Sequence, residues 1–350
     1  MIAYFLLIHF LVPRSKLFNI RSLNNDTSVV SLGKNRVNLK VDDKTHTSIP
    51  KKFSPIGIEI LPPKQKLLTL VSPCEVVSPK SKINDTFKCL KLLVPGKPIA
   101  CIYNDSEDSI ISPVIEHTGV WEDFIMQFVY KLLLQNDSLS LIDIGSFNGQ
   151  YSLQAAALGR KALAVEPIPK HVKMIMKAIQ LNNFTDKNTL VHNAISNKVG
   201  DSIRMVPVDN FPNSNKNKGG LKIQVAFDKN VIAAKTITLN DLTDVINFDY
   251  AILVMDIEDH EGYAMEKADK LFNKVKIPFV LMEWFAGRWT TEYKFKQIPK
   301  LMDFMYSRGY WPHKYVPNRY ELLDTILKKE GFETWPIDII WKHRLANFKF

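Results

Sequence analysis

The feature that most constrains this chain is a regular alternation of short apolar segments and amphipathic segments. Apolar runs at 139–144, 162–165, 189–194, 249–255 and 279–283 have the length and composition of buried strands. Segments 121–134, 150–158, 171–181, 263–274 and 298–308 have helical spacing. Strands that alternate with helices form parallel β-α-β units with helices on both faces of the sheet. The sequence therefore predicts an α/β fold.

Two further segments depart from this alternation. Residues 201–239 interrupt it, and the polar run "NSNKNKGG" in their middle predicts a loop between two strands. The segment 101–119 predicts a strand, an acidic turn and a second strand.

The first strand of the alternation ends in a glycine-containing turn. Asp143, Gly145 and Gly149 form the pattern D-x-G-x-x-x-G, and ligands of open α/β sheets bind beyond the carboxyl ends of the strands. The NAD fingerprint G-x-G-x-x-G has a third glycine, which lets the backbone approach a pyrophosphate. This chain lacks that glycine, which disfavours a dinucleotide. The next strand ends at Glu166, followed by Pro167, where an acid can accept hydrogen bonds from a ribose diol. The set predicts S-adenosylmethionine; a purely structural turn and NAD are the alternatives.

The residues assigned to this cofactor come from the ends of four strands. Asn193, after the third strand, is expected either to meet the adenine edge or to cap a turn. The predicted cofactor-binding residues are Asp143, Gly145, Phe147, Asn148, Gly149, Glu166, Pro167, Asn193 and Asp256.

From about residue 109 to residue 344 the sequence resembles the FkbM family of S-adenosylmethionine-dependent methyltransferases. The likeness rests on "IDIGSFNGQYSLQAAALG", "AVEPIPKHVKMIMKAIQLNN", "VHNAIS", "VMDIEDHEG" and "LMEW". Where the family reads K-I-D-V-E-G-x-E, the acids recur at Asp256, Glu258 and Glu261, while Val254 and Asp259 replace the lysine and the glycine. The resemblance implies a Rossmann-like class I methyltransferase sheet, preceded here by an N-terminal extension. It also implies methyl transfer to a hydroxyl oxygen, often on a sugar or polyketide.

The segment after the fourth strand carries the predicted catalytic residues. A weakly acidic alcohol must lose a proton to accept a methyl group. Alternation along a continued strand would place Asp256, Glu258 and His260 on one side. Asp256 and Glu258 are expected to position cofactor and acceptor, with His260 or Glu258 as the base, and neighbouring acids are expected to raise the pKa of His260. A helix N-cap is one alternative. A divalent metal is another, which we do not predict.

Residues near the last strands are assigned to the acceptor. The predicted substrate-binding residues are Glu261, Glu283 and Trp284. Trp284, Phe285 and Trp289 would form a platform for a sugar face, or else pack in the core. Trp121 and Glu122 would cover the cofactor or simply start a helix.

Charge distribution separates the N-terminal region from the rest. Residues 1–97 hold 16 Lys/Arg and 6 Asp/Glu, which accounts for the whole net charge of +10, and the remaining residues hold 30 of each sign. A neutral body argues against a nucleic-acid substrate. We expect residues 1–20 to be a signal or membrane-anchor segment, residues 21–97 a basic stem with extended elements, and residues 98–350 the methyltransferase domain.

Two features favour the secretory pathway, with the Golgi lumen as the expected site. The first is the apolar N-terminus "MIAYFLLIHFLVP", which is shorter than a span of about 20 residues. The second is a set of glycosylation sequons at Asn25, Asn84, Asn104, Asn136 and Asn183. The three cysteines allow one disulfide and one free thiol.

These observations predict an enzyme that methylates a carbohydrate hydroxyl, with membrane association through the N-terminus as a further expectation. The alternatives are a cytoplasmic O-methyltransferase of a small molecule or lipid, and a non-catalytic binding module that keeps the fold.

Overall fold

The computed structural model describes residues 72–207, 217–226, 228, 233–316, 319–322 and 331–348. All of them belong to one compact unit that spans residues 68–350. The expected signal or anchor segment, most of the basic stem and the sequon at Asn25 lie outside the described residues. The domain boundary that we predict between residues 97 and 98 falls between strands β1 (Lys88–Lys91) and β2 (Ile99–Ile102), which pair antiparallel.

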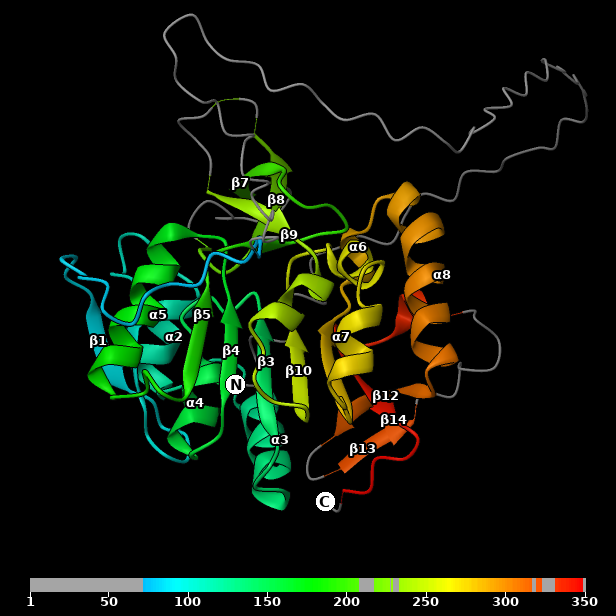
Figure 1. Ribbon diagram of the computed structural model, residues 1–350, viewed down its shortest axis with the longest axis horizontal. Helices are drawn as coiled ribbons and strands as arrows, with labels where there is room; N and C mark the ends of the chain where they lie inside the picture. Colours follow the sequence, from blue (N-terminus) through cyan, green and yellow to red (C-terminus); the bar gives the residue numbers. More distant parts are fainter. Residues whose placement is uncertain are drawn as a thin grey trace, which may run out of the picture. The chain divides into compact units, whose positions relative to one another are not determined.

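An eight-stranded sheet forms the centre of the unit (Figure 1). Its order is β13-β12-β14-β11-β10-β3-β4-β5. The bounds are β3 Ser140–Ile144, β4 Ala162–Val165, β5 Asn188–Val191, β10 Ala251–Met255, β11 Phe279–Glu283, β12 Tyr310–Val316, β13 Arg319–Leu322 and β14 Asp338–His343. The five strands from β5 to β11 are parallel, and β14 runs antiparallel between β11 and β12. This arrangement confirms the predicted Rossmann-like class I methyltransferase fold.

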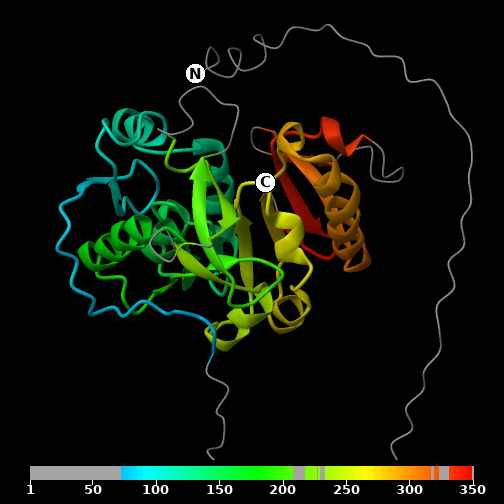
Figure 2. The same cartoon turned by 90° about the horizontal axis from the view of Figure 1, so that it is seen from above.

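Helices cover both faces of this sheet (Figures 1 and 2). Helices α2 (Ile111–Thr118), α3 (Asp123–Gln135), α4 (Gln150–Ala157) and α5 (Pro169–Leu181) share one apolar core. The 3-10 helix η3 (Leu239–Asp244) and helices α6 (Glu261–Met265), α7 (Asp269–Lys274) and α8 (Thr291–Ser307) share the other. Neighbouring residues of β3 alternate between the cores, with Leu141 in the first and Ile142 in the second. A strand buried on both faces explains the continuous apolar runs in the sequence.

The chain reverses its direction across the sheet between β3 and β10. From β3 it proceeds outward to β4 and β5, and it then returns to the other side of β3 through β10. This reversal is a topological switch point, where the loops leaving two neighbouring strands diverge and leave room for a ligand.

A smaller sheet lies beyond the carboxyl ends of the central strands (Figure 1). It has the order β6-β9-β7-β8, with bounds β6 Ala194–Ile195, β7 Ser202–Pro207, β8 Leu221–Val225 and β9 Ala234–Ile237. The predicted interruption of the helix–strand alternation is therefore this sheet, and β7 and β8 are the two strands expected around the polar loop.

Helix α2 differs from the sequence prediction, which assigned a strand to this segment. Asp108 accepts hydrogen bonds from the backbone N–H groups of Ile110 (3.2 Å) and Ser112 (2.8 Å). These donors have no partner inside the helix, so an acid at this position stabilises the helix start. Ile111 and Ile115 lie on the buried side of this helix and pack into the core.

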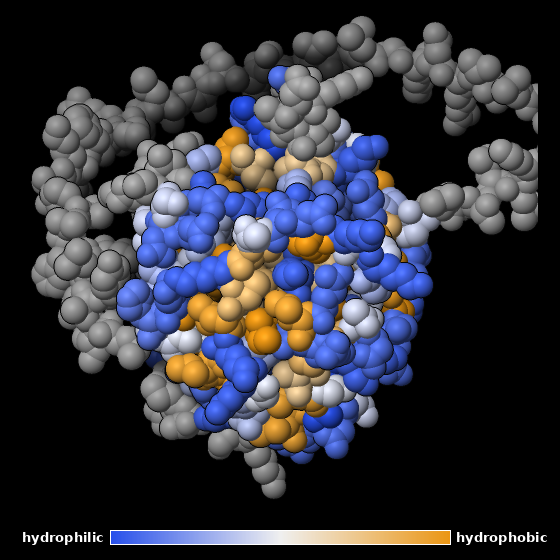
Figure 3. Space-filling view, turned by 90° about the vertical axis from the view of Figure 1, so that its left-hand side faces the viewer, coloured by the Kyte–Doolittle hydropathy of each residue, from blue (hydrophilic) through white to orange (hydrophobic). Residues whose placement is uncertain are grey.

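The unit contains one disulfide and one free cysteine. Cys89 and Cys101 form a disulfide between β1 and β2, and Cys74 is free. Figure 3 shows the face that carries β1 and α5, where apolar patches lie among hydrophilic residues, as on most folded domains. Within the described part of the chain, no helix combines the length and the apolar character needed to cross a bilayer.

Candidate active site

Gly145 forms the sharp turn that ends β3. Its φ is +82°, and a Cβ added here would lie 1.8 Å from the backbone oxygen of Asp256. The backbone N–H of Asp256 donates to the oxygen of Ile144 at 3.0 Å. The ends of β3 and β10 therefore approach so closely at the switch point that only glycine fits there.

Asp143, in β3, connects this turn to helix α4. Its side chain is 1% exposed, and Oδ2 accepts a hydrogen bond from the N–H of Ser152 in α4 at 3.2 Å. Burial, with a smaller contribution from Glu166, raises the pKa of Asp143 to about 7. Gly149, with φ +78°, precedes α4, and a Cβ there would lie 3.2 Å from the side chain of Ile175. Both residues shape the turn without facing open space.

Glu166, which follows β4, contacts two backbone N–H groups and one imidazole ring. Its Oε2 accepts from the N–H of Phe147 (2.8 Å), and its Oε1 accepts from the N–H of Ile168 (2.9 Å) and contacts Nδ1 of His171 (3.1 Å). A carboxylate oxygen has two lone pairs. Oε2 therefore keeps acceptor capacity, and hydrogen bonding to a ribose diol stays a prediction.

A first cavity, with an empty volume of about 470 Å³, lies between these loops and the small sheet. Of the predicted cofactor-binding residues, Gly145, Phe147, Glu166, Pro167, Asn193 and Asp256 line it, whereas Asp143, Asn148 and Gly149 do not. Side chains of Ala194, Ile195, Met205 and Ile223 add an apolar wall. Apolar walls with a few polar groups are typical of small-ligand sites, and this cavity has that composition.

Asn193 uses both ends of its amide to hold the chain. Its Oδ1 accepts from the N–H of Glu75 (2.7 Å), and its Nδ2 donates to the oxygen of Lys235 (3.1 Å). The Asn193 side chain therefore holds two backbone segments at the edge of the first cavity. This role is similar to the turn-capping role that the sequence left open.

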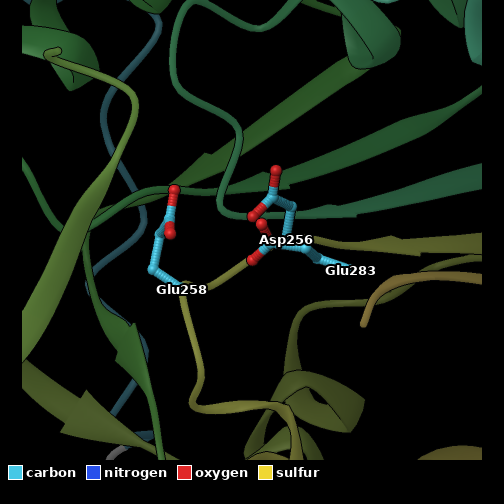
Figure 4. A group of neighbouring side chains, drawn as sticks. All are labelled: Asp256, Glu258 and Glu283. Atoms are coloured by element: carbon cyan, nitrogen blue, oxygen red, sulfur yellow. The ribbon is translucent and has the colours of Figure 1, made fainter. Parts of the chain in front are cut away.

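The carboxyl groups of Asp256, Glu258 and Glu283 converge where β10 and β11 end (Figure 4). One oxygen from each lies within 4.8 Å of the others. Burial raises the pKa of Asp256, whereas the charge of Arg288 and a hydrogen bond with Glu283 act in the opposite direction. The residue is nevertheless exposed to solvent. Burial and the charge of Asp256 hold the pKa of Glu283 well above its usual range.

The route of the chain after β10 differs from the expectation of a continued strand. β10 ends at Met255, and Glu258 and Asp259 adopt left-handed backbone conformations with φ of +55° and +68°. Simple alternation therefore does not apply. Asp256 and Glu258 still share the cleft, but His260 turns away from it.

Arg288, which the sequence analysis missed, neutralises much of this acidic cluster. It comes from the 3-10 helix η4 (Ala286–Arg288), forms ion pairs with Glu258 and Glu283, and lies 3.4 Å from Asp259. Burial raises the pKa of Glu258 to about 8, although Arg288 opposes this. The three converging carboxyl groups could hold a metal ion, but the guanidinium already supplies a positive charge there, and we predict no metal.

His260 corrects the sequence prediction on two points. Its Nε2 lies 3.0 Å from Oγ of Ser196, its ring packs against Tyr263, and it lines neither of the two cavities described here. Burial lowers the pKa of His260 to about 4, whereas the neighbouring acids were expected to raise it. Desolvation of the imidazolium is the cause of this shift.

Two predicted substrate-binding residues have structural contacts instead of open faces. Glu261 is 4% exposed and accepts from the N–H of Ile257 at 3.0 Å, so it closes its own loop. Trp284 is 1% exposed, donates from Nε1 to the oxygen of Phe332 (2.8 Å) and stacks on Trp335. A fully packed indole has no face left for a sugar, so for Trp284 the structure favours the core-packing alternative.

A second cavity, of about 450 Å³, opens on the other side of Asp256, between α3 and the strands β10, β11, β12 and β14. Four carboxyl groups line it: Glu122, Asp256, Glu283 and Asp338. Its apolar walls include Phe124, Phe128 and Tyr315. The sequence indicated Glu122 only as a cofactor cover or helix start, and Asp338 was assigned no role because it lies beyond the strand–helix alternation.

The sequence of this site matches a known family of domains. Residues 143–311 match the model of the "Methyltransferase FkbM domain". The chain contains an FkbM methyltransferase domain. The match begins at Asp143, at the end of β3, and includes Glu166, Asp256 and Glu283, so the FkbM domain holds the switch point and the acidic cluster. The predicted resemblance to the FkbM family is confirmed for residues 143–311, slightly less than half of the chain.

Solved structures with similarity to the chain are distant. A precorrin-6y C5,15-methyltransferase from Geobacter metallireducens is 15% identical, with a TM-score of 0.31 over 62% of this chain and 86% of its own. An O-methyltransferase from Bacillus cereus, in complex with SAH, is 9% identical, with a TM-score of 0.35 over 68% and 97%. The bifunctional kinase-methyltransferase WbdD is 10% identical, with a TM-score of 0.36 over 65% and 40%. No curated protein matches the sequence.

Proposed function

We propose that the protein is an S-adenosylmethionine-dependent O-methyltransferase that methylates a carbohydrate hydroxyl in the secretory pathway. The observation that carries this proposal is the position of Asp256, which lines both cavities. A methyl donor in the first cavity and an acceptor in the second would meet at this carboxyl group. In-line transfer needs that kind of alignment.

The first cavity fits a nucleoside joined to an amino acid. The bare backbone at Gly145 lets the loops that follow β3 and β10 approach closely, and both Gly145 and Asp256 line this cavity. Glu166 has acceptor capacity for a ribose, and Ala194, Ile195 and Met205 offer an apolar wall for adenine. When bound, S-adenosylmethionine supplies an electrophilic methyl group, so the protein has to orient the acceptor and remove its proton.

Asp256 is the proposed base of this reaction. It reaches solvent and both cavities, while Glu258 is held by Arg288 and His260 lies outside both. The hydrogen bond with Glu283 and the charge of Arg288 favour the ionised form of Asp256. An ionised Asp256 can accept the proton of a hydroxyl group and orient its oxygen.

Asp256→Asn tests this assignment. Removing a general base lowers turnover by roughly 10²–10⁴-fold. We expect that loss with radiolabelled S-adenosylmethionine and a glycan panel, while calorimetry finds the affinity for S-adenosylhomocysteine changed by less than about 10-fold. Asp105→Asn, at an exposed position, serves as control. Unchanged turnover of Asp256→Asn would remove this residue from the chemistry.

A second candidate is an O-methyltransferase of a lipid or small molecule in the cytoplasm. The apolar walls of the second cavity, with Phe124, Phe128 and Tyr315, favour it. Adding lipid and aromatic alcohols to the acceptor panel separates the two candidates. Cofactor binding without turnover on any acceptor would instead favour the non-catalytic module.

A further inference from the structure

The second cavity has an unusual distribution of charge. It contains four carboxyl groups, and the residues that line it include no lysine, arginine or histidine. The four acids come from four different elements: Glu122 starts α3, Asp256 follows β10, Glu283 ends β11 and Asp338 starts β14. The fold therefore brings them together from distant parts of the sequence.

Two of these acids lie apart from the cluster around Arg288. Glu122 Oε2 accepts from the hydroxyl of Tyr151 at 2.7 Å, and neither Glu122 nor Asp338 has an ion pair among the described residues. Burial and the mutual repulsion of the acids raise the pKa of Asp338 to about 7 and hold that of Glu122 well above its usual range. Like charges in a shared site resist joint ionisation. A ligand that brings hydrogen-bond donors or positive charge would relieve this repulsion, and an anionic ligand would increase it.

The rest of the cavity is apolar. Phe124, Phe128 and Tyr315 line it together with Leu281 and Ile340. Phe128 and Tyr315 pack edge to face with ring centroids 5.7 Å apart. An occupant that suits both parts of this cavity has hydroxyl or amino groups on one side and a C–H face on the other.

We propose that the second cavity is the acceptor site and that it selects a polyhydroxylated acceptor without negative charge. Glu122 and Asp338 are its specificity-determining residues. They accept hydrogen bonds from hydroxyl or amino groups of the acceptor, while the aromatic wall packs against its C–H face. This inference rests on the proposed function, because it takes the cofactor to occupy the first cavity and the methyl group to reach Asp256 from there.

Binding of matched glycosides tests the proposal. The probes are a p-nitrophenyl glucoside, the corresponding glucosaminide and the corresponding glucuronide, titrated into the full chain saturated with S-adenosylhomocysteine. We expect the glucosaminide and the glucoside to bind, and the glucuronide to bind at least roughly 10-fold more weakly. In Glu122→Gln and Asp338→Asn, which keep the shape of the side chains, the difference between glucosaminide and glucuronide should shrink by about 10-fold per substitution.

Three controls keep the result interpretable. Glu333→Gln removes a surface carboxyl that pairs with Lys294 and does not line the second cavity, and it should leave the discrimination intact. Affinity for S-adenosylhomocysteine should stay within about twofold in both cavity variants. The melting temperature of each variant, compared with wild type, identifies a variant that fails to fold.

The outcomes that overturn the proposal are distinct. Equal binding of the glucuronide, no glycoside binding by the saturated wild type, or unchanged discrimination in both variants would refute the acceptor class. A parallel loss of S-adenosylhomocysteine affinity would assign the second cavity to the cofactor. Failure of the wild type to bind S-adenosylhomocysteine at all would contradict the proposed function itself.

Discussion

Gly145 is the residue at which local geometry and function are most tightly connected. It has nearly the same backbone conformation as Gly159, with φ of +82° and +77°, but their surroundings differ. A Cβ at Gly145 would lie 1.8 Å from the oxygen of Asp256, whereas a Cβ at Gly159 would meet nothing within 4 Å. Substituting each glycine by alanine therefore distinguishes two costs. Backbone strain arises at both positions, whereas a steric collision arises only at Gly145.

We expect Gly159→Ala to lower the free energy of unfolding by about 1–2 kcal/mol, the cost of a left-handed residue with a side chain. Gly145→Ala should lower it by about 2–5 kcal/mol, because β10 must also move. Urea unfolding measures both values. Equal losses in the two variants would mean that the contact with Asp256 is unimportant.

Single residues also show what sequence alone could identify. Gly145, Glu166 and Asp256 were found because each follows a strand whose position is visible as an apolar run. His260 was misjudged because its burial depends on the turn at Glu258, which has no sequence signal. Arg288 and Asp338 were missed because their partners lie on other elements, and the contacts form only through the fold.

Asp143 connects two elements, since it lies on β3 and accepts from Ser152 in α4. Its pKa of about 7 in the folded state exceeds 3.8, the ordinary value. Between these values the native state binds more protons than the unfolded state. The contribution of Asp143 to stability is therefore greatest at low pH and is lost as the pH rises through about 7.

Asp143→Asn removes this dependence. Relative to the variant, wild type should lose roughly 2–4 kcal/mol of stability between pH 4 and pH 8. Urea unfolding of both proteins at several pH values gives the difference directly, with Asp105→Asn as the exposed control. A difference that stays constant across this range would show that Asp143 titrates normally.

At the scale of elements, the parallel strands could be predicted and the antiparallel ones could not. β3, β4, β10 and β11 are buried on both faces and read as continuous apolar runs. β12 mixes Tyr310 with exposed Trp311 and carries a lysine and a proline. Such a strand has no simple period, and its place beside β14 follows from tertiary packing.

At the scale of the whole molecule, the proposed compartment makes its own prediction. Cys89 and Cys101 form a disulfide, a bond that persists in oxidising compartments. The sequon asparagines Asn84, Asn104 and Asn183 are exposed. Protein expressed in animal cells should therefore migrate faster on gels after glycosidase treatment. Unchanged mobility together with recovery in the cytosolic fraction would favour the cytoplasmic alternative.

The central claim is that the first cavity of the FkbM domain binds the cofactor through the β3 turn and Glu166. Calorimetric titration of S-adenosylhomocysteine into wild type and Glu166→Ala tests it most directly, with melting temperatures to confirm that the variant folds. We predict one binding site per chain in the wild type. In the variant the binding free energy should weaken by about 1.5–3 kcal/mol, because hydrogen bonds to a charged acceptor are lost. No binding by the wild type, or equal affinity in a folded Glu166→Ala variant, would contradict the account.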